Sequence, residues 1–327
     1  MDGISVEIHE PANVLSTMLL AIAGTPTDAK PHRITEYGLE HVKPFRDHAS
    51  LAWLKEFYRR ESVHELYGHA AQLAGPVSFA PRSPQLPSYL ASYEPARMKD
   101  LPAKMAAFYE DAKLGTFRRA RNAEYTMAAA DVKDVLDGAR IEDFLAELYG
   151  PVKYKLVAVP VPTHPASGGA VDARSAWESF AFLFPPKVPA GSDDPVAWSY
   201  DPDATQVLVQ HELSHAILAD AMRDHPGLAS DLRAVLAKIP KDSHFAQTFK
   251  DGETRVAELF IRGSSVAYLR RTRGDEQAYR WMEEQARRLG TTLVRDFFLV
   301  IERYLSVRKW ADLGAFLADL PRTLSAT

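Results

Sequence analysis

Apolar residues recur every three to four positions through most of the first 150 residues of the chain. This periodicity is typical of amphipathic helices. It predicts helices near residues 11–24, 34–59 with interruptions, 62–74, 100–129 and 131–149. The stretch from Pro81 to Pro95 is rich in Pro and Ser and predicts a surface loop.

The pattern becomes strand-like after residue 150. The run from Tyr154 to Val161 is almost continuously apolar and predicts a strand, with Pro160 at an edge or at a strand end. Gly168 and Gly169 mark a turn. A second strand is expected over Val171–Phe184, although its alternation is imperfect. These strands could guide an extended substrate or be purely structural.

A helix that is buried on most sides is expected around residue 211, because most positions flanking it are apolar. Capping residues at Asp201 and Asp203 predict its start, and Pro226-Gly227 predicts its end. Further helices are expected near 226–238, 244–272, 275–289, 291–307 and 310–320, with breaks at Gly274 and Gly290.

Together these elements predict a helix-rich α+β fold, with a small sheet beside the helix at residue 211 and a C-terminal helical part. We divide the chain into a mainly helical part over 1–150, a sheet and helix over 151–222, and a helical part over 223–327. These three parts are expected to form one catalytic unit.

The sequence His211-Glu212-Leu213-Ser214-His215 has the spacing of a zinc hydrolase helix. Two histidines four residues apart project from the same helical face and can share a metal. Glu212 lies about 100° around the helix from His211, where its carboxylate can act as a general base on a water molecule. The alternative is a purely structural role, in which both histidines lie in the core and form hydrogen bonds with carbonyl groups.

A related pattern occurs at His64-Glu65-Leu66-Tyr67-Gly68-His69, with the histidines five residues apart. Such a pair lies about 140° apart on a regular helix and could share a metal only through a local bulge. One dipeptidyl-peptidase family uses a similar sequence. Gly68 weakens this helix, and a surface or cleft-lining helix is the preferred interpretation.

A catalytic zinc usually takes three protein ligands, so a third is needed beyond His211 and His215. Glu258 is the chosen third ligand because its neighbours are apolar and a buried carboxylate needs a counter-charge. Glu253 is the runner-up. Arg262 could orient Glu258, or it could form an ordinary helix salt bridge with Glu258 instead.

These residues resemble the gluzincin type of zincin metallopeptidase, with His-Glu-x-x-His on one helix and a Glu on a later helix. More narrowly, Gln210 to Ala216 together with Glu258 and Arg262 is similar to an uncharacterised bacterial family of zinc peptidases, domain of unknown function 4932. Val6-Glu7-Ile8 and Asp47-His48 resemble the opening of that family. The resemblance implies a zincin-like fold, one zinc ion per chain and a peptide or protein substrate. Gly263 departs from the Ala expected after Arg262.

The composition of the chain further limits the class of protein, its binding partners and the residues that could hold a metal. The chain has 327 residues, 46% hydrophobic and 25% charged, as in a globular protein of one or two domains. A net charge of -4 gives no electrostatic footprint for nucleic acid or an anionic membrane. Arg118, Arg119 and Arg121 predict a solvated helix face. With no cysteine present, any metal must be held by His, Asp or Glu.

No signal peptide or membrane-spanning segment is expected, so the sequence as given predicts a cytoplasmic protein. A cleaved signal peptide would leave the same chain, which keeps secretion or a periplasmic location open.

We expect hydrolysis by a zinc-activated water, with Glu212 as the general base. The sequence weakly favours an endopeptidase over an exopeptidase. The alternatives are a non-catalytic peptide-binding protein and a zinc hydrolase of a non-peptide amide. Residues that could stabilise the oxyanion are Tyr268, His244, His164 and Tyr200.

Overall fold

The computed structural model describes residues 3–24, 32–58, 63–75, 79–82, 99–166, 168–187, 197–307 and 309–326. Its contacts group the chain into two compact units, each formed by two stretches of sequence. The first comprises Met1–Asp137 and Tyr154–Glu212, and the second comprises Gly138–Lys153 and Leu213–Thr327. Helix α11 (Pro202–Arg223) is continuous across the boundary, which follows Glu212.

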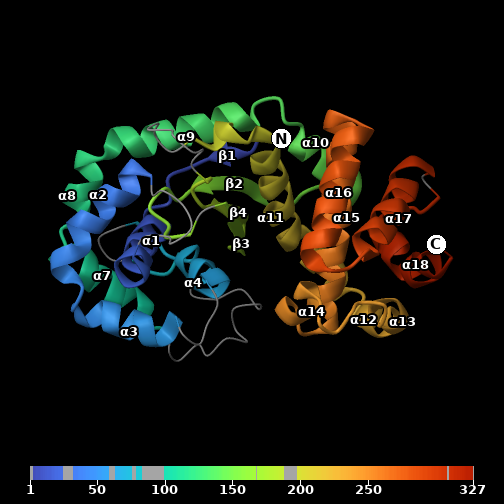
Figure 1. Ribbon diagram of the computed structural model, residues 1–327, viewed down its shortest axis with the longest axis horizontal. Helices are drawn as coiled ribbons and strands as arrows, with labels where there is room; N and C mark the ends of the chain where they lie inside the picture. The colour runs from blue at the N-terminus through green and yellow to red at the C-terminus, as the bar shows by residue number, and fades with distance from the viewer. Residues whose placement is uncertain are drawn as a thin grey trace. The chain divides into compact units, whose positions relative to one another are not determined.

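The strands of the first unit form one four-stranded mixed sheet in the order β1-β2-β4-β3. Their bounds are β1 Ser5–Val6, β2 Lys155–Pro160, β3 Ala170–Arg174 and β4 Glu178–Leu183. The β1/β2 and β2/β4 pairs are parallel, and the β3/β4 pair is antiparallel. This order leaves β3 as one edge of the sheet (Figure 1).

Helices cover both faces of this sheet, which explains why β2 is apolar almost throughout. Val157 and Val159 join an apolar core with residues of α1, α3, α4 and α7, while α9 contacts β1 and β2 (Figure 1). The helices that lie in the described parts of the first unit are α1 Glu10–Ala23, α2 Arg33–Val42, η1 Lys43–Phe45, α3 Ala49–Tyr58, α4 Val63–Ala70, α7 Leu101–Asp111, α8 Leu114–Ala120, α9 Asn122–Leu136 and η2 Trp198–Tyr200.

The described elements of the second unit are helices, with the long helix α15 (Gly252–Arg273) packed against α16 and α17 (Figure 1). A methyl group on Gly263 of α15 would lie 2.8 Å from the backbone nitrogen of Phe298 in α17. Only glycine allows this close approach, which accounts for the departure from Ala at this position. The other helices are α10 Ile141–Tyr149, α12 Leu228–Asp231, α13 Arg233–Leu236, α14 His244–Thr248, α16 Asp275–Leu289, α17 Leu293–Val307 and α18 Leu313–Ser325.

The helix-rich α+β class and the small sheet agree with the sequence analysis. The single strand expected over Val171–Phe184 is wrong: two strands, β3 and β4, flank a turn at 175–177, and the imperfect alternation reflects that reversal. The helix expected over 244–272 is also two helices, because Asp251 caps the start of α15 by accepting a hydrogen bond from the Thr254 backbone nitrogen.

Two further sequence expectations concern a loop and membrane-spanning helices. The loop predicted over Pro81–Pro95 lies outside the described residues from position 83 onward. Within the described parts of the chain, none of the helices combines the length and the apolar character that crossing a membrane requires.

Candidate metal centre

Helix α11 carries the two motif histidines and the glutamate between them. The helix starts as predicted, with the Asp201 carboxylate accepting a hydrogen bond from the Ala204 backbone nitrogen at 3.0 Å. It ends at Arg223, before Pro226-Gly227. His211 and Glu212 are each 7% exposed. Groups this deeply withdrawn from water need polar or charged partners.

His211 and His215 lie one turn apart on α11, and a ring nitrogen of each lies within 4.8 Å of the other. Helical geometry accounts for this proximity, since residues at i and i+4 share a face. Glu212 points in a different direction around the same helix. One oxygen of its carboxylate nevertheless lies within 4.8 Å of a ring nitrogen of His215.

Glu258 comes from helix α15 and meets His215 within the second unit. One carboxylate oxygen, Oε1, lies 3.5 Å from His215 Nε2. Ligand atoms about 2.1 Å from a tetrahedral zinc are about 3.4 Å apart, so this separation suits a shared metal. His211, His215 and Glu258 form a group of side chains that could hold a metal ion.

Arg262 engages the other oxygen of Glu258. Its Nη2 lies 3.0 Å from Glu258 Oε2, and its Nη1 donates a hydrogen bond to Gln285 Oε1 at 3.0 Å. The i, i+4 ion pair that the sequence offered as the alternative for Arg262 is therefore present, and a pairing of this kind restricts how a carboxylate can turn. Glu253, the runner-up ligand, is exposed in the first turn of α15.

A second carboxylate lies beside Glu212 in the first unit. Asp172, in the middle of edge strand β3, has an oxygen within 4.8 Å of a Glu212 oxygen. Asp172 also accepts His64 Nε2 as an ion-pair partner at 2.9 Å. Asp172 and Glu212, with His215 on the next turn of α11, are a second group that could hold a metal.

The His64–Asp172 pair is the part of this region that sequence reasoning missed. Asp172 and His64 are distant in sequence, and only the packing of α4 against β3 brings them together. The His-Glu pattern at residues 64–69 was the available signal. His69, on another side of α4, is 5% exposed.

The four residues that the sequence offered for stabilising the oxyanion lie on different elements and differ in their burial. Tyr268 is fully buried and donates a hydrogen bond to the Ala139 carbonyl at 2.7 Å, about 15 Å along α15 from Glu258. His244 is exposed at the start of α14. His164 stacks on Phe184 with ring centroids 3.5 Å apart, and burial lowers its pKa to about 4.

Tyr200 ends the short helix η2 and is half-buried. Tyr149, in the second unit, is packed against Phe260 of α15, and burial raises the pKa of its hydroxyl. A phenol in that state is neutral near pH 7, so Tyr149 adds no charge to this part of α15.

Comparisons with family models, with curated proteins and with solved structures gave no match.

Proposed function

We propose that the protein is a zinc-dependent metallopeptidase with a zincin-like fold. His211, His215 and Glu258 would hold one zinc ion, and Glu212 would act as the general base. The 3.5 Å approach of Glu258 Oε1 to His215 Nε2 supports this proposal most directly. It joins the predicted third ligand to the motif helix, although the two are far apart in sequence.

The donor set favours catalysis over a purely structural metal. Structural zinc sites are closed by four protein ligands, whereas catalytic sites have three protein ligands and leave a position for water or substrate. Two imidazoles and one carboxylate make three. The carboxylate of Glu212, on the same helix, supplies the base that a structural site does not need.

When bound, zinc would polarise the substrate carbonyl and lower the pKa of a coordinated water toward neutrality. Glu212 accepts a proton from the water as the new carbon–oxygen bond forms. The same carboxyl then gives that proton to the leaving nitrogen as the carbon–nitrogen bond breaks. Arg262 keeps one oxygen of Glu258 occupied, which leaves the other oxygen for the metal.

The experiment that tests this function compares wild type with Glu212→Gln. Both proteins are brought to one zinc ion per chain and incubated with a mixed peptide library, and new chain ends are detected by mass spectrometry. We expect equal zinc content and a loss of hydrolysis by about 100-fold or more, since a positioned base contributes about 10²–10⁴-fold.

Two outcomes would contradict the proposal. Equal activity in the Gln variant would remove Glu212 from the chemistry. A zinc-loaded wild type that cleaves no peptide would favour a binding protein, or a hydrolase of a different amide.

A further inference from the structure

Gln285 is a polar residue at a core position of helix α16. The buried residues of this helix are Ala278, Met282, Gln285 and Leu289, and their spacing of three to four residues is that of a helical face packed against a core. The other three residues are apolar, whereas Gln285 is a polar side chain that is only 6% exposed. Burying an amide costs free energy unless the amide is hydrogen-bonded. A glutamine at this position therefore needs a polar partner inside the second unit.

Arg262 of α15, the helix against which α16 packs, is that partner (Figure 1). Arg262 Nη1 donates a hydrogen bond to Gln285 Oε1 at 3.0 Å, and Arg288 Nη2 donates a longer one to the same oxygen at 3.4 Å. The side chain of Arg262 is 12% exposed, so its guanidinium is largely withdrawn from water. The amide oxygen of Gln285 therefore holds one end of a mostly buried guanidinium.

The other end of this guanidinium contacts the proposed metal ligand. Arg262 Nη2 lies 3.0 Å from Glu258 Oε2, while Glu258 Oε1 is the oxygen that lies 3.5 Å from His215 Nε2. A guanidinium is planar and its donors have a fixed geometry, so a contact that fixes Nη1 also limits where Nη2 can point. Glu258, Arg262 and Gln285 all belong to the second unit. A change at Gln285 should consequently reach Glu258 through Arg262.

We infer that Gln285 is a positioning residue of the proposed metal centre: it fixes Arg262, and Arg262 in turn holds Glu258 with one oxygen toward His215. This inference rests on the metal centre of the proposed function. It makes metal binding depend on α16, a helix from which no ligand is proposed. The sequence signal for this role is a glutamine within the apolar stripe of α16.

The test measures the zinc affinity of the full-length chain by competition with a chromogenic chelator, in the absence of any peptide. Gln285→Met keeps a side chain of similar length that suits the apolar stripe, but it removes the acceptor oxygen. We expect zinc binding to weaken by about 3- to 10-fold, which is less than the roughly 10- to 100-fold typical of a group that touches a ligand directly.

Three further variants show whether the amide oxygen acts through Arg262. Gln285→Glu restores an acceptor oxygen and should recover most of the affinity. Gln285→Met should cause no additional loss in a protein that already carries Arg262→Ala, because the group through which it acts is then absent. Gln247→Met is the matched control: it removes an exposed glutamine that donates to the Asp242 carbonyl, and it should bind zinc as wild type does.

The remaining outcomes separate the two proposals. Wild-type affinity in Gln285→Met, equal losses in Gln285→Met and Gln285→Glu, or losses that add in the double variant would each overturn the inference and leave the metallopeptidase proposal intact. A wild type that binds no zinc would overturn both. A wild type that binds zinc and cleaves no peptide would overturn the metallopeptidase proposal alone.

Discussion

At the scale of single residues, the two oxygens of Glu258 carry different interactions. Oε1 approaches His215, and Oε2 lies 3.0 Å from an Arg262 nitrogen. A carboxylate held in this way has little freedom to rotate, which keeps the oxygen near His215 in place. Groups that orient a ligand typically change metal affinity by about 10- to 100-fold when they are removed.

Arg262→Ala should therefore weaken zinc binding by about 10- to 100-fold, measured by competition with a chromogenic chelator. Arg262→Lys should recover part of the affinity, because it restores a charge without the planar fork. Arg280→Ala removes an arginine from an exposed i, i+4 pair with Glu276 and should leave the affinity unchanged. Identical affinity in all four proteins would show that Arg262 plays no part in holding Glu258.

At the scale of elements, the contact of α15 with α17 depends on Gly263. A methyl group there would lie 2.8 Å from the Phe298 backbone nitrogen and 3.0 Å from the Phe297 carbonyl carbon. Backbone atoms cannot move aside as a flexible side chain can. The helix that carries Glu258 and Arg262 is thereby fixed against its neighbour one residue beyond Arg262.

Gly263→Ala should lower the free energy of unfolding by up to roughly 2 kcal/mol in a denaturant titration. Higher helix propensity favours Ala by about 1 kcal/mol, but overpacking costs about 1–3 kcal/mol. Gly314→Ala is the matched control, since its methyl group would meet only side-chain atoms of Asp312 and His225. A Gly263→Ala protein as stable as wild type would mean that the helices separate without penalty.

The sequence analysis succeeded where local chemistry decides the structure. The capped start of α11 and its end before Pro226 both follow from neighbouring residues, as do the burial of Glu258 and the exposure of Glu253. The pairing of β1 with β2 could not be predicted in this way, because Ser5 and its partner Val157 are far apart in the sequence. The same holds for His64 and Asp172, which meet only through the packing of α4 on β3.

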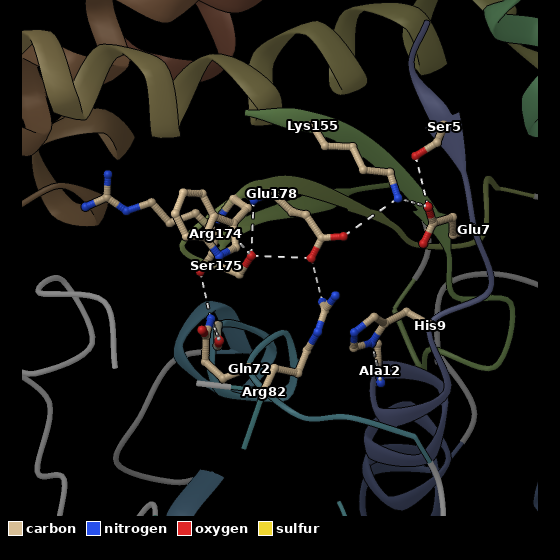
Figure 2. Close-up of polar contacts among 12 residues, drawn as sticks. Ser5, Glu7, His9, Ala12, Gln72, Arg82, Lys155, Arg174, Ser175 and Glu178 are labelled. Carbon is tan, nitrogen blue, oxygen red and sulfur yellow. Dashed lines mark hydrogen bonds and ion pairs between the residues drawn. The ribbon is translucent and has the colours of Figure 1, made fainter. Parts of the chain in front are cut away.

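At the scale of the whole molecule, several segments of the first unit meet at buried Glu178. Arg82 Nη1 lies 2.6 Å from Glu178 Oε2, and Lys155 Nζ lies 3.7 Å from Glu178 Oε1 (Figure 2). Lys155 also contacts Glu7, which follows β1. His9 lies nearby (Figure 2), and its ring makes T-shaped contacts with Phe180 and Phe182 of β4. Charges therefore help to join β1, β2 and β4.

Stability should consequently fall as the pH is lowered. Burial, reinforced by the Arg82 charge and opposed by Glu7, lowers the pKa of His9 from 6.5 to about 4. Between these values the unfolded chain binds a proton at His9 and the folded chain does not. The free energy of unfolding should drop by up to roughly 3 kcal/mol from pH 6.5 to pH 4 through this residue.

The variant His9→Asn tests this expectation, because Asn does not titrate and can still cap α1, as His9 Nδ1 does for the Ala12 nitrogen. Denaturant titrations at pH 7 and pH 4.5 should show a smaller loss of stability in the variant than in wild type. An identical loss in the two proteins would show that His9 is not responsible.

The measurement that tests the central claim most directly is the zinc content of the purified protein by elemental analysis. Wild type is compared with His215→Ala, Glu258→Ala and His69→Ala. We expect one zinc ion per chain in wild type and His69→Ala, and none in the other two variants. Wild type without zinc under chelator-free conditions, or loss of zinc only in His69→Ala, would contradict the account.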